Sequence, residues 1–340
     1  MRVEYIVFGV IIVGVIVLSL FNFGGGGSNY TNQGTAPDLV GISGWINTEP
    51  LSLDQLRGKV VLIDFWTYSC INCIRTLPHL KGWHERYSDD GLVIIGVHTP
   101  EFEFEKDYNN VKAAVENYGL EYAIAQDNDY ATWQAYGNRY WPRKYILDAQ
   151  GNIRYDHIGE GGYEETERVI QDLLKEANYQ INETIGSSDS GPGLRPIGFT
   201  PELYFGYNFA RAPLGNPEGL SPGGTVDYQK IDVTQPNIIY LEGQWTNGPD
   251  GMTAVGNGKV FLRYTAKSVN IVAGGSGNAK ILADGNVLSE TNVGTDVNQD
   301  SSIDVTGRKL YNIVSTVNYE SHLLEIQAED GFEIYTFTFG

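Results

Sequence analysis

The sequence predicts an α/β domain followed by an all-β domain, with one membrane-spanning helix in front of them. Three observations lead to this fold class: an apolar run at residues 5–23, alternating strand and helix patterns over residues 37–180, and short β-type runs without helical periodicity over residues 196–340. The predicted organisation is an anchor and Gly-rich tether over 1–28, an α/β domain, a linker over 181–195 and a β-sandwich of jelly-roll type.

The N-terminal segment is apolar and long enough to cross a bilayer. Residues 5–23 carry no charged side chain. A membrane-spanning helix needs roughly 20 such residues, whereas a signal peptide has a core of about 7 to 15. No clear small-residue cleavage site follows, so we expect an uncleaved anchor with the flexible tether Gly-Gly-Gly-Gly-Ser behind it. Arg2 marks the cytoplasmic side, which places the rest of the chain in an extracytoplasmic location.

The charge of the chain argues against one class of function. The sequence has 23 Lys and Arg residues against 42 Asp and Glu residues, and its formal net charge is −19. Binding of nucleic acid requires basic side chains that neutralise phosphates. The sequence contains no such basic cluster, so we expect no nucleic-acid partner.

Both cysteines of the 340-residue chain form one CxxC pair, Cys70 and Cys73. The run at 60–63 is short and rich in β-branched residues, which is typical of a buried parallel strand, and apolar residues at helical spacing follow from 74 to 83. Cys70 therefore falls at or just before a helix N-terminus, where free N–H groups and the helix dipole stabilise a thiolate. We expect Cys70 to be the attacking sulfur and Cys73 the resolving sulfur.

Three other uses of the CxxC pair agree less well with the sequence. A structural zinc site needs four ligands, and one pair supplies only two. A structural disulfide at this spacing closes a very small loop and gains little loop entropy. Peroxidase chemistry requires a proline where Ile63 stands, although its threonine is present as Thr67. Thiol-disulfide exchange is therefore the preferred chemistry, with the redox-active disulfide Cys70–Cys73 in place of a bound cofactor and with no metal site.

Asp64 lies in the apolar run of the predicted strand, six residues before Cys70. Burial disfavours the charged form of a carboxyl group and raises its pKa, which suits a general base near neutral pH. The alternative is a polar residue at a solvated end of the strand.

The sequence DFWTYSCINC at residues 64–73 resembles the active-site motif of the thioredoxin superfamily, in particular of its membrane-tethered extracytoplasmic members. The resemblance implies that Asp64 manages the proton of Cys73. It also implies that Pro142 is the cis-proline that faces the CxxC pair, the alternative being a trans proline at a strand entrance. The dipeptide between the cysteines matches neither thioredoxin nor the strongly oxidising periplasmic enzymes and leaves the redox direction open. By this resemblance the residues that bind substrate are Trp66, Ile71, Asn72, Trp141 and Pro142.

The predicted order of elements in the α/β domain agrees with the thioredoxin fold. A buried strand is expected at 93–97 and a helix of an added segment at 111–118. A hairpin is expected at 145–155, and the closing helix, with its apolar residues on one face, at 163–178.

The C-terminal part predicts short strands separated by turn residues. These runs are 260–264, 269–272, 279–282, 323–326 and 332–339. The segments 200–207, 241–245, 307–311 and 335–340 resemble the C-terminal domain of DipZ-type proteins. The resemblance implies a carbohydrate-binding-module-like sandwich and therefore a carbohydrate ligand. Trp245, Tyr204 and Tyr207 could stack on a sugar, but in a sandwich such aromatic residues are more often part of the core.

Two further features receive no catalytic or metal-binding role. His98 ends a predicted central strand, where α/β sheets place ligand sites, and His79 falls on a different face of its helix from the cysteines.

The acidic loop at 296–304 alternates oxygen-bearing side chains but lacks the glycine and the final Glu of an EF-hand, so a solvated loop is preferred over a metal site.

Together these features predict a membrane-anchored, extracytoplasmic thiol-disulfide oxidoreductase, with a reductase preferred. The expected partners are protein thiols and disulfides as substrates and a separate CcdA-type membrane protein as electron donor, because this chain has one predicted span where many relatives have a multi-pass conduit. One alternative is a dedicated cytochrome c maturation thiol reductase. Another is a cell-surface binding protein that uses the thioredoxin fold as a scaffold.

Overall fold

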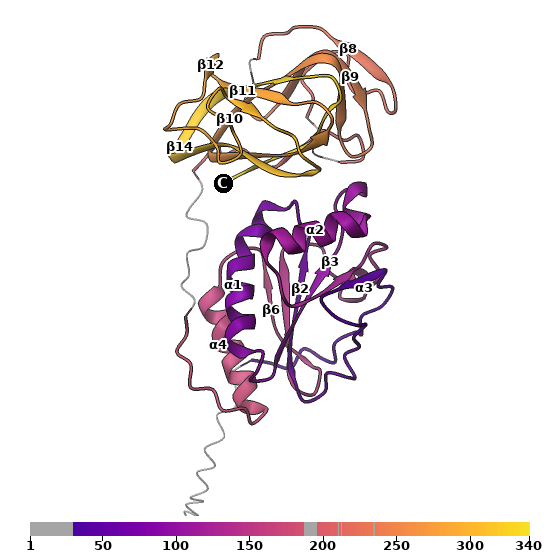
Figure 1. The fold of residues 1–340 in the computed structure, drawn as a ribbon, viewed down its shortest axis with the longest axis vertical. Helices are drawn as coiled ribbons and strands as arrows, with labels where there is room; N and C mark the ends of the chain where they lie inside the picture. The colour runs from indigo at the N-terminus through magenta and orange to yellow at the C-terminus, as the bar shows by residue number, and fades with distance from the viewer. Residues whose placement is uncertain (1–29, 187–195, 210, 212, 234) are drawn as a thin grey trace, which may run out of the picture.

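The computed structural model describes residues 30–186 and 196–340, apart from positions 210, 212 and 234. An α/β part is followed by an all-β part (Figure 1). The predicted anchor and tether over 1–28, and the predicted linker beyond residue 186, lie outside the described residues. Within the described ranges, no helix combines the length and the apolar character needed to span a membrane.

Within the described residues, the α/β part contains one six-stranded sheet. Its strands are β1 (Gly44–Ile46), β2 (Val60–Trp66), β3 (Leu92–His98), β4 (Ala123–Gln126), β5 (Arg143–Leu147) and β6 (Ile153–Ile158). They lie in the order β1-β4-β3-β2-β5-β6, with β2, β3 and β4 parallel and β5 antiparallel to both neighbours. Because both faces of the central sheet are covered, every residue of β2 is buried.

The helices of this part are α1 (Ile71–Tyr87), the 3-10 helix η1 (Glu103–Lys106), α2 (Tyr108–Tyr118), α3 (Ala131–Ala135) and α4 (Tyr163–Glu176). Successive side chains of a strand point to opposite faces of the sheet. Val60, Leu62 and Trp66 pack in the core that α1 and α4 cover, and the odd-numbered residues of β2 pack in the opposite core, beside α3. By this alternation, Asp64 lies on the face covered by α1, the helix that carries Cys73.

The elements predicted from periodicity agree with the observed ones to within a few residues. The strand at 93–97 lies in β3, the helix at 111–118 lies in α2, and the hairpin at 145–155 is β5 and β6. The closing helix α4 begins at the predicted residue and ends two residues earlier than expected. The short elements β1, β4, η1 and α3 were not predicted, because three to five residues are too few to show a period.

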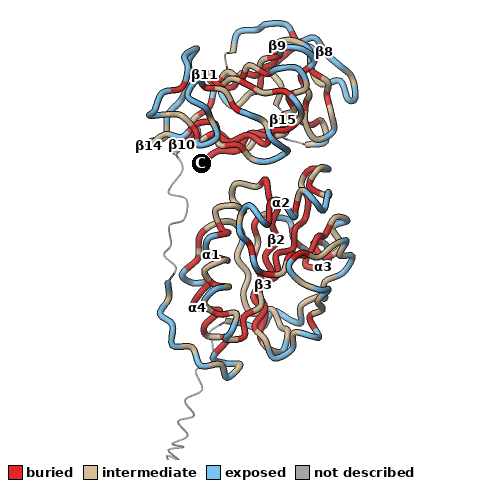
Figure 2. The backbone as a smooth tube through the Cα atoms, viewed as in Figure 1, coloured by how far each residue is buried: buried red, intermediate tan, exposed pale blue. Residues whose placement is uncertain are grey.

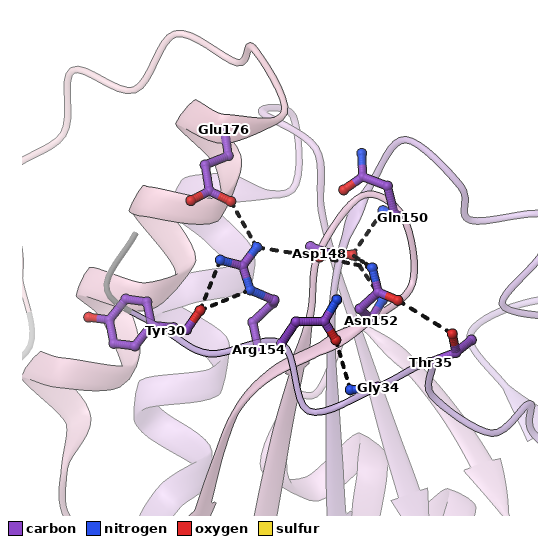
Figure 3. Close-up of polar contacts among 9 residues, drawn as sticks. Tyr30, Gly34, Thr35, Asp148, Gln150, Asn152, Arg154 and Glu176 are labelled. Carbon is purple, nitrogen blue, oxygen red and sulfur yellow. Dashed lines mark hydrogen bonds and ion pairs between the residues drawn. The ribbon is translucent and has the colours of Figure 1, made fainter. Parts of the chain in front are cut away.

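The first described residues are fixed to the β5-β6 hairpin by a polar network (Figure 3). Arg154 on β6 donates to the carbonyl oxygen of Tyr30 at 3.0 and 3.2 Å. Its Nη1 also lies 3.0 Å from a carboxylate oxygen of Glu176 and 3.4 Å from one of Asp148. The register of β2 with β5 puts this hairpin turn at the end of the sheet opposite to the CxxC pair. The network therefore stabilises the end of the sheet that is distant from the thiols.

The all-β part is one sheet system in which every named strand pair is antiparallel. Its strands are β7 (Leu203–Tyr204), β8 (Thr225–Tyr228), β9 (Ile239–Asn247), β10 (Met252–Gly275), β11 (Ala279–Ala283), β12 (Asn286–Val287), β13 (Ser302–Ile303), β14 (Lys309–Ala328) and β15 (Phe332–Phe339). Figure 2 shows that the buried residues of both parts gather along their strands and core-facing helices.

The prediction of separate strands at 260–264 and 269–272 is wrong, because both runs belong to the single strand β10. β10 pairs with β14 along most of its length, and its register shifts between Ala266 and Ser268. Such an irregularity bends a strand without ending it, so a local break in the sequence pattern does not mark a turn. Trp245 has no accessible surface and lies in the core of the all-β part, whereas Tyr204 is buried in a separate small cluster.

The two parts are joined by the segment that follows β3. Phe102 is buried in a small apolar cluster with Tyr204 and Val272 from the all-β part, and its ring centroid lies 5.5 Å from that of Tyr335. The Tyr204 hydroxyl donates to Glu101 Oε1 at 2.6 Å. Phe104 also packs against Tyr335, and the Glu103 N–H donates to Asp250 Oδ2 at 2.7 Å, so the parts share an interface of aromatic contacts and hydrogen bonds.

We expect Phe102→Ala to destabilise the junction between the two parts. Removal of a buried phenylalanine side chain costs about 3 to 5 kcal/mol, so the melting temperature of the full-length chain in detergent should fall by several degrees in a calorimetric scan. Val317→Ala is the matched control, because Val317 is 85% exposed. An unchanged melting temperature for the Phe102 variant would show that the junction contributes nothing to stability.

Candidate active site

Cys70 is the N-cap residue of α1 and has extended backbone angles. Its Sγ accepts a hydrogen bond from the Cys73 backbone N–H at 3.4 Å. Both cysteines are free thiols in the structure; Cys70 is partly exposed and Cys73 is buried. The predicted position of Cys70 at a helix N-terminus is confirmed, and the pair has one sulfur that a substrate can reach and one that it cannot.

The Cys73 thiol is held in its protonated form by its surroundings. Burial raises the pKa of Cys73 well above the ordinary value, and the neighbouring Cys70 adds to this effect. A buried thiol with a raised pKa is a poor nucleophile until a base removes its proton. The resolving step therefore requires a proton acceptor close to Cys73.

Asp64 supplies a titratable group on that side of the sheet. The residue has no accessible surface, and burial raises the pKa of its carboxyl group to about 7. This position rules out the alternative of a solvated strand end. A carboxyl group with this pKa exchanges a proton near neutral pH, as the sequence predicted for a general base.

Lys144 is a second buried charge that the sequence analysis missed. It lies directly opposite Asp64 in the antiparallel pair of β5 and β2, and its Nζ is 4.0 Å from Asp64 Oδ1. Burial lowers the pKa of Lys144, and its positive charge in turn opposes the rise in the pKa of Asp64. The sequence does contain a signal for this burial, because Lys144 is followed directly by the apolar residues of the predicted strand.

Glu105 on η1 is a further missed residue, and it holds the loop that precedes Cys70. Its Oε1 accepts a hydrogen bond from the Ser69 hydroxyl at 2.5 Å, and its Oε2 accepts one from the Phe102 N–H at 3.0 Å. Burial raises the pKa of Glu105, while the hydrogen bond from Ser69 acts in the opposite direction. One carboxylate, that of Glu105, therefore connects the loop before Cys70 to the segment that packs against the all-β part.

The residues predicted to bind substrate occupy different environments. The Trp141–Pro142 peptide bond is cis, as the resemblance implies, and Pro142 directly precedes β5 at the sheet edge from which the CxxC loop departs. Trp141 is half-buried and donates from Nε1 to the Thr99 carbonyl oxygen at 3.1 Å. Ile71 and Asn72 are also half-buried, at the start of α1. These positions suit residues at the margin of a substrate groove.

Trp66 does not share that position. Its side chain has no accessible surface and packs edge-on against His98, with the ring centroids 5.3 Å apart. The expectation that Trp66 lines the groove is therefore wrong, because it points to the same buried face as Val60 and Leu62. Its ring belongs to the same buried core as Cys73.

The two histidines near the site are packing residues. His98 is fully buried and stacked on Tyr68, and burial lowers the pKa of His98 to about 3, so it stays neutral at physiological pH. His79 stacks on Tyr163 with the ring centroids 3.5 Å apart. Among the residues that the structure describes, no cluster of three or more His, Cys, Asp or Glu side chains could hold a metal ion.

Comparison with known proteins agrees with this geometry. Residues 34–156 match the AhpC/TSA family, and residues 200–340 match the thioredoxin-like C-terminal domain. Thiol-disulfide oxidoreductase YkuV of Bacillus subtilis is 31% identical over 141 residues, which cover 41% of this chain and 94% of YkuV. The chain belongs to the thioredoxin-like superfamily.

Within this superfamily the chain resembles DipZ-type proteins. Protein DipZ of Mycobacterium bovis is 40% identical over 332 residues, which cover 94% of this chain and 45% of DipZ. The chain thus spans about half the length of that relative. A crystal structure of a thiol-disulfide isomerase from Corynebacterium glutamicum is 24% identical, with a TM-score of 0.38, over 41% of this chain and 96% of that one.

If Asp64 accepts the proton of Cys73, the resolving step should depend on pH. Only the ionised carboxylate can act as the base, so the rate of that step should rise as the pH increases through about 7. Asp64→Asn should slow the step by about 100-fold and remove this rise. The measurement is the release of a coloured aryl thiolate from its mixed disulfide with Cys70, followed by stopped-flow absorbance between pH 5 and 9.

Two variants complete this test. Asp54→Asn changes an exposed carboxylate and should leave the profile unchanged. Lys144→Met removes a positive charge beside Asp64, which makes ionisation of the carboxyl group less favourable and should move the midpoint to higher pH. A wild-type profile in the Asp64 variant would exclude Asp64 as the base.

Proposed function

We propose that this chain is a membrane-anchored, extracytoplasmic thiol-disulfide oxidoreductase that acts mainly as a reductase through Cys70 and Cys73. One observation carries the proposal: an accessible sulfur caps a helix, a buried sulfur lies one turn further on, and a buried carboxyl group with a pKa of about 7 lies on the same face of the sheet. The similarity to the thiol-disulfide oxidoreductases YkuV and ResA, from Bacillus subtilis and Halalkalibacterium halodurans, supports it.

The exchange proceeds in two displacement steps. The Cys70 thiolate attacks one sulfur of a substrate disulfide, so that a mixed disulfide forms and the second substrate sulfur leaves as a thiolate, which takes a proton from water. Cys73 then transfers its proton to Asp64 and attacks the Cys70 sulfur. The Cys70–Cys73 disulfide forms, and the first substrate sulfur leaves as a thiolate. Two electrons have passed from the protein dithiol to the substrate disulfide.

The partners and the location belong to the same proposal. The apolar run at 5–23 supports a membrane anchor, and a CcdA-type membrane protein is the electron donor that reduces the pair again. The uniformly antiparallel strand pairs support a jelly-roll-type sandwich for the all-β part. Carbohydrate binding gains no support from Trp245 or Tyr204, because both rings are buried, whereas Tyr207 is half-buried.

A Cys73→Ser variant should trap substrates. Without the resolving sulfur, the mixed disulfide on Cys70 persists, so covalent complexes that dissociate with dithiothreitol should appear on non-reducing gels. Mass spectrometry then identifies the bound proteins, and apocytochrome c as the dominant partner would favour a dedicated cytochrome c maturation reductase. Cys70→Ser is the control and should trap nothing. Equal trapping by both variants, or by neither, would contradict the order of attack.

The direction of exchange follows from the midpoint potential of the Cys70–Cys73 couple. For a reductase we expect a value of about −230 mV or lower, near that of thioredoxin, in the full-length chain titrated in detergent against dithiothreitol or glutathione buffers. A value above about −180 mV would indicate an oxidant or isomerase. A pair with no reversible couple would leave the fold as a scaffold for a surface binding protein.

A further inference from the structure

The docking of the all-β part leaves a cleft beside the CxxC pair. The cleft has a volume of about 810 Å³. One wall contains Tyr68 and Ile71, which lie two residues before and one residue after Cys70. The opposite wall contains Arg308 and Lys309, at the start of β14. A group bound in this cleft would therefore touch residues on either side of Cys70 and would contact both parts of the chain.

The relative position of the two walls is fixed close to the thiols. Glu105 accepts a hydrogen bond from Ser69, which directly precedes Cys70, and Phe102 and Glu101 from the same segment hold the all-β part. In space, the contacts of this one segment thus connect the junction of the two parts to the loop before Cys70. These contacts therefore hold the all-β wall of the cleft in a fixed position relative to the loop before Cys70.

Two of the three basic residues of the cleft have a carboxylate partner. Three basic side chains and one acidic side chain, that of Asp296, line the cleft. Arg75 is paired with Glu160, and Arg308 is paired with Glu333. Lys309 has no carboxylate partner among the residues that the structure describes, and its Nζ lies 5.0 Å from the centre of the Tyr311 ring. Lys309 therefore presents a positive charge that is available to a ligand.

The cleft also offers a polar group to an extended peptide. Asn270 and Asn312 on the long strands hydrogen-bond to each other, and Asn110 on α2 donates to the Phe104 carbonyl oxygen. The exposed amide of Asn117 on α2 has no hydrogen-bond partner among the described residues, and it can donate to and accept from a peptide backbone. The volume lies within the range of about 300 to 1,000 Å³ typical of ligand sites. The cleft can therefore hold a few residues of a polypeptide.

We propose that this cleft binds the substrate polypeptide on one side of its target cysteine, and that Lys309 selects substrates with an Asp or Glu in that segment. The proposal rests on the proposed exchange reaction and adds a substrate class to it: disulfide-bonded proteins with an acidic residue close to the reacting cysteine. The all-β part then acts as a specificity element, because it supplies the selecting charge while the α/β part supplies the sulfur.

The test compares two disulfide-linked peptides that differ only in a Glu or a Lys placed three residues from the cysteine. Full-length protein in detergent should reduce the Glu peptide faster than the Lys peptide, by about 3- to 5-fold in kcat/KM at low salt, and the difference should shrink at high salt. Lys309→Glu should reverse the preference. Reduction of a small uncharged disulfide should stay the same in both proteins, because it needs only the thiols.

Lys267→Glu is the matched control. Lys267 is also exposed on a strand of the all-β part with its Nζ 4.9 Å from a tyrosine ring, that of Tyr319, but it does not line the cleft. This variant changes the net charge equally and should keep the preference for the Glu peptide. An equal loss of preference in both lysine variants, or no preference in the wild type, would overturn the cleft assignment. A failure to reduce even the small disulfide would instead contradict the proposed exchange reaction.

Discussion

The burial of the Asp64 carboxyl group within the central sheet governs the chemistry of the α/β part. The strand β2 is buried along its whole length, so its one acidic residue cannot reach water. The cost of ionising a carboxyl group there raises its pKa to about 7, and Lys144 across the β2-β5 pair limits the rise. The same dry surroundings keep Cys73 protonated. One constraint, the exclusion of water, thus produces both the acid and the base of the resolving step.

The loop after β3 connects this chemistry to the rest of the chain. Glu105 uses one carboxylate oxygen to hold Ser69 before Cys70 and the other to hold the turn that carries Phe102. Because Phe102 is buried against the all-β part, a displacement of that part would act on the segment that positions the loop. The geometry of Cys70 and the position of the second part are therefore set by the same short stretch of chain.

The sequence predicted those features that local pattern encodes. A continuous apolar run and a helical period placed β2 and α1, and their junction placed Cys70 and Cys73 correctly. Lys144 and Glu105 were missed because a charged residue is expected at the surface, and their burial depends on partners 80 and 36 residues away. The burial of Trp66 was missed although the residue ends a strand whose two faces are both covered.

Separating reactivity from selection has a physical advantage in such a chain. The environment of the thiols must remain dry and closely packed, so it tolerates little variation. The start of β14, by contrast, is exposed, and a change of charge there leaves the buried groups under the cysteines untouched. A surface charge also acts through an interaction that salt weakens, which suits brief encounters with many substrates. The position of Lys309 on the second part thus allows recognition to vary while the redox centre stays the same.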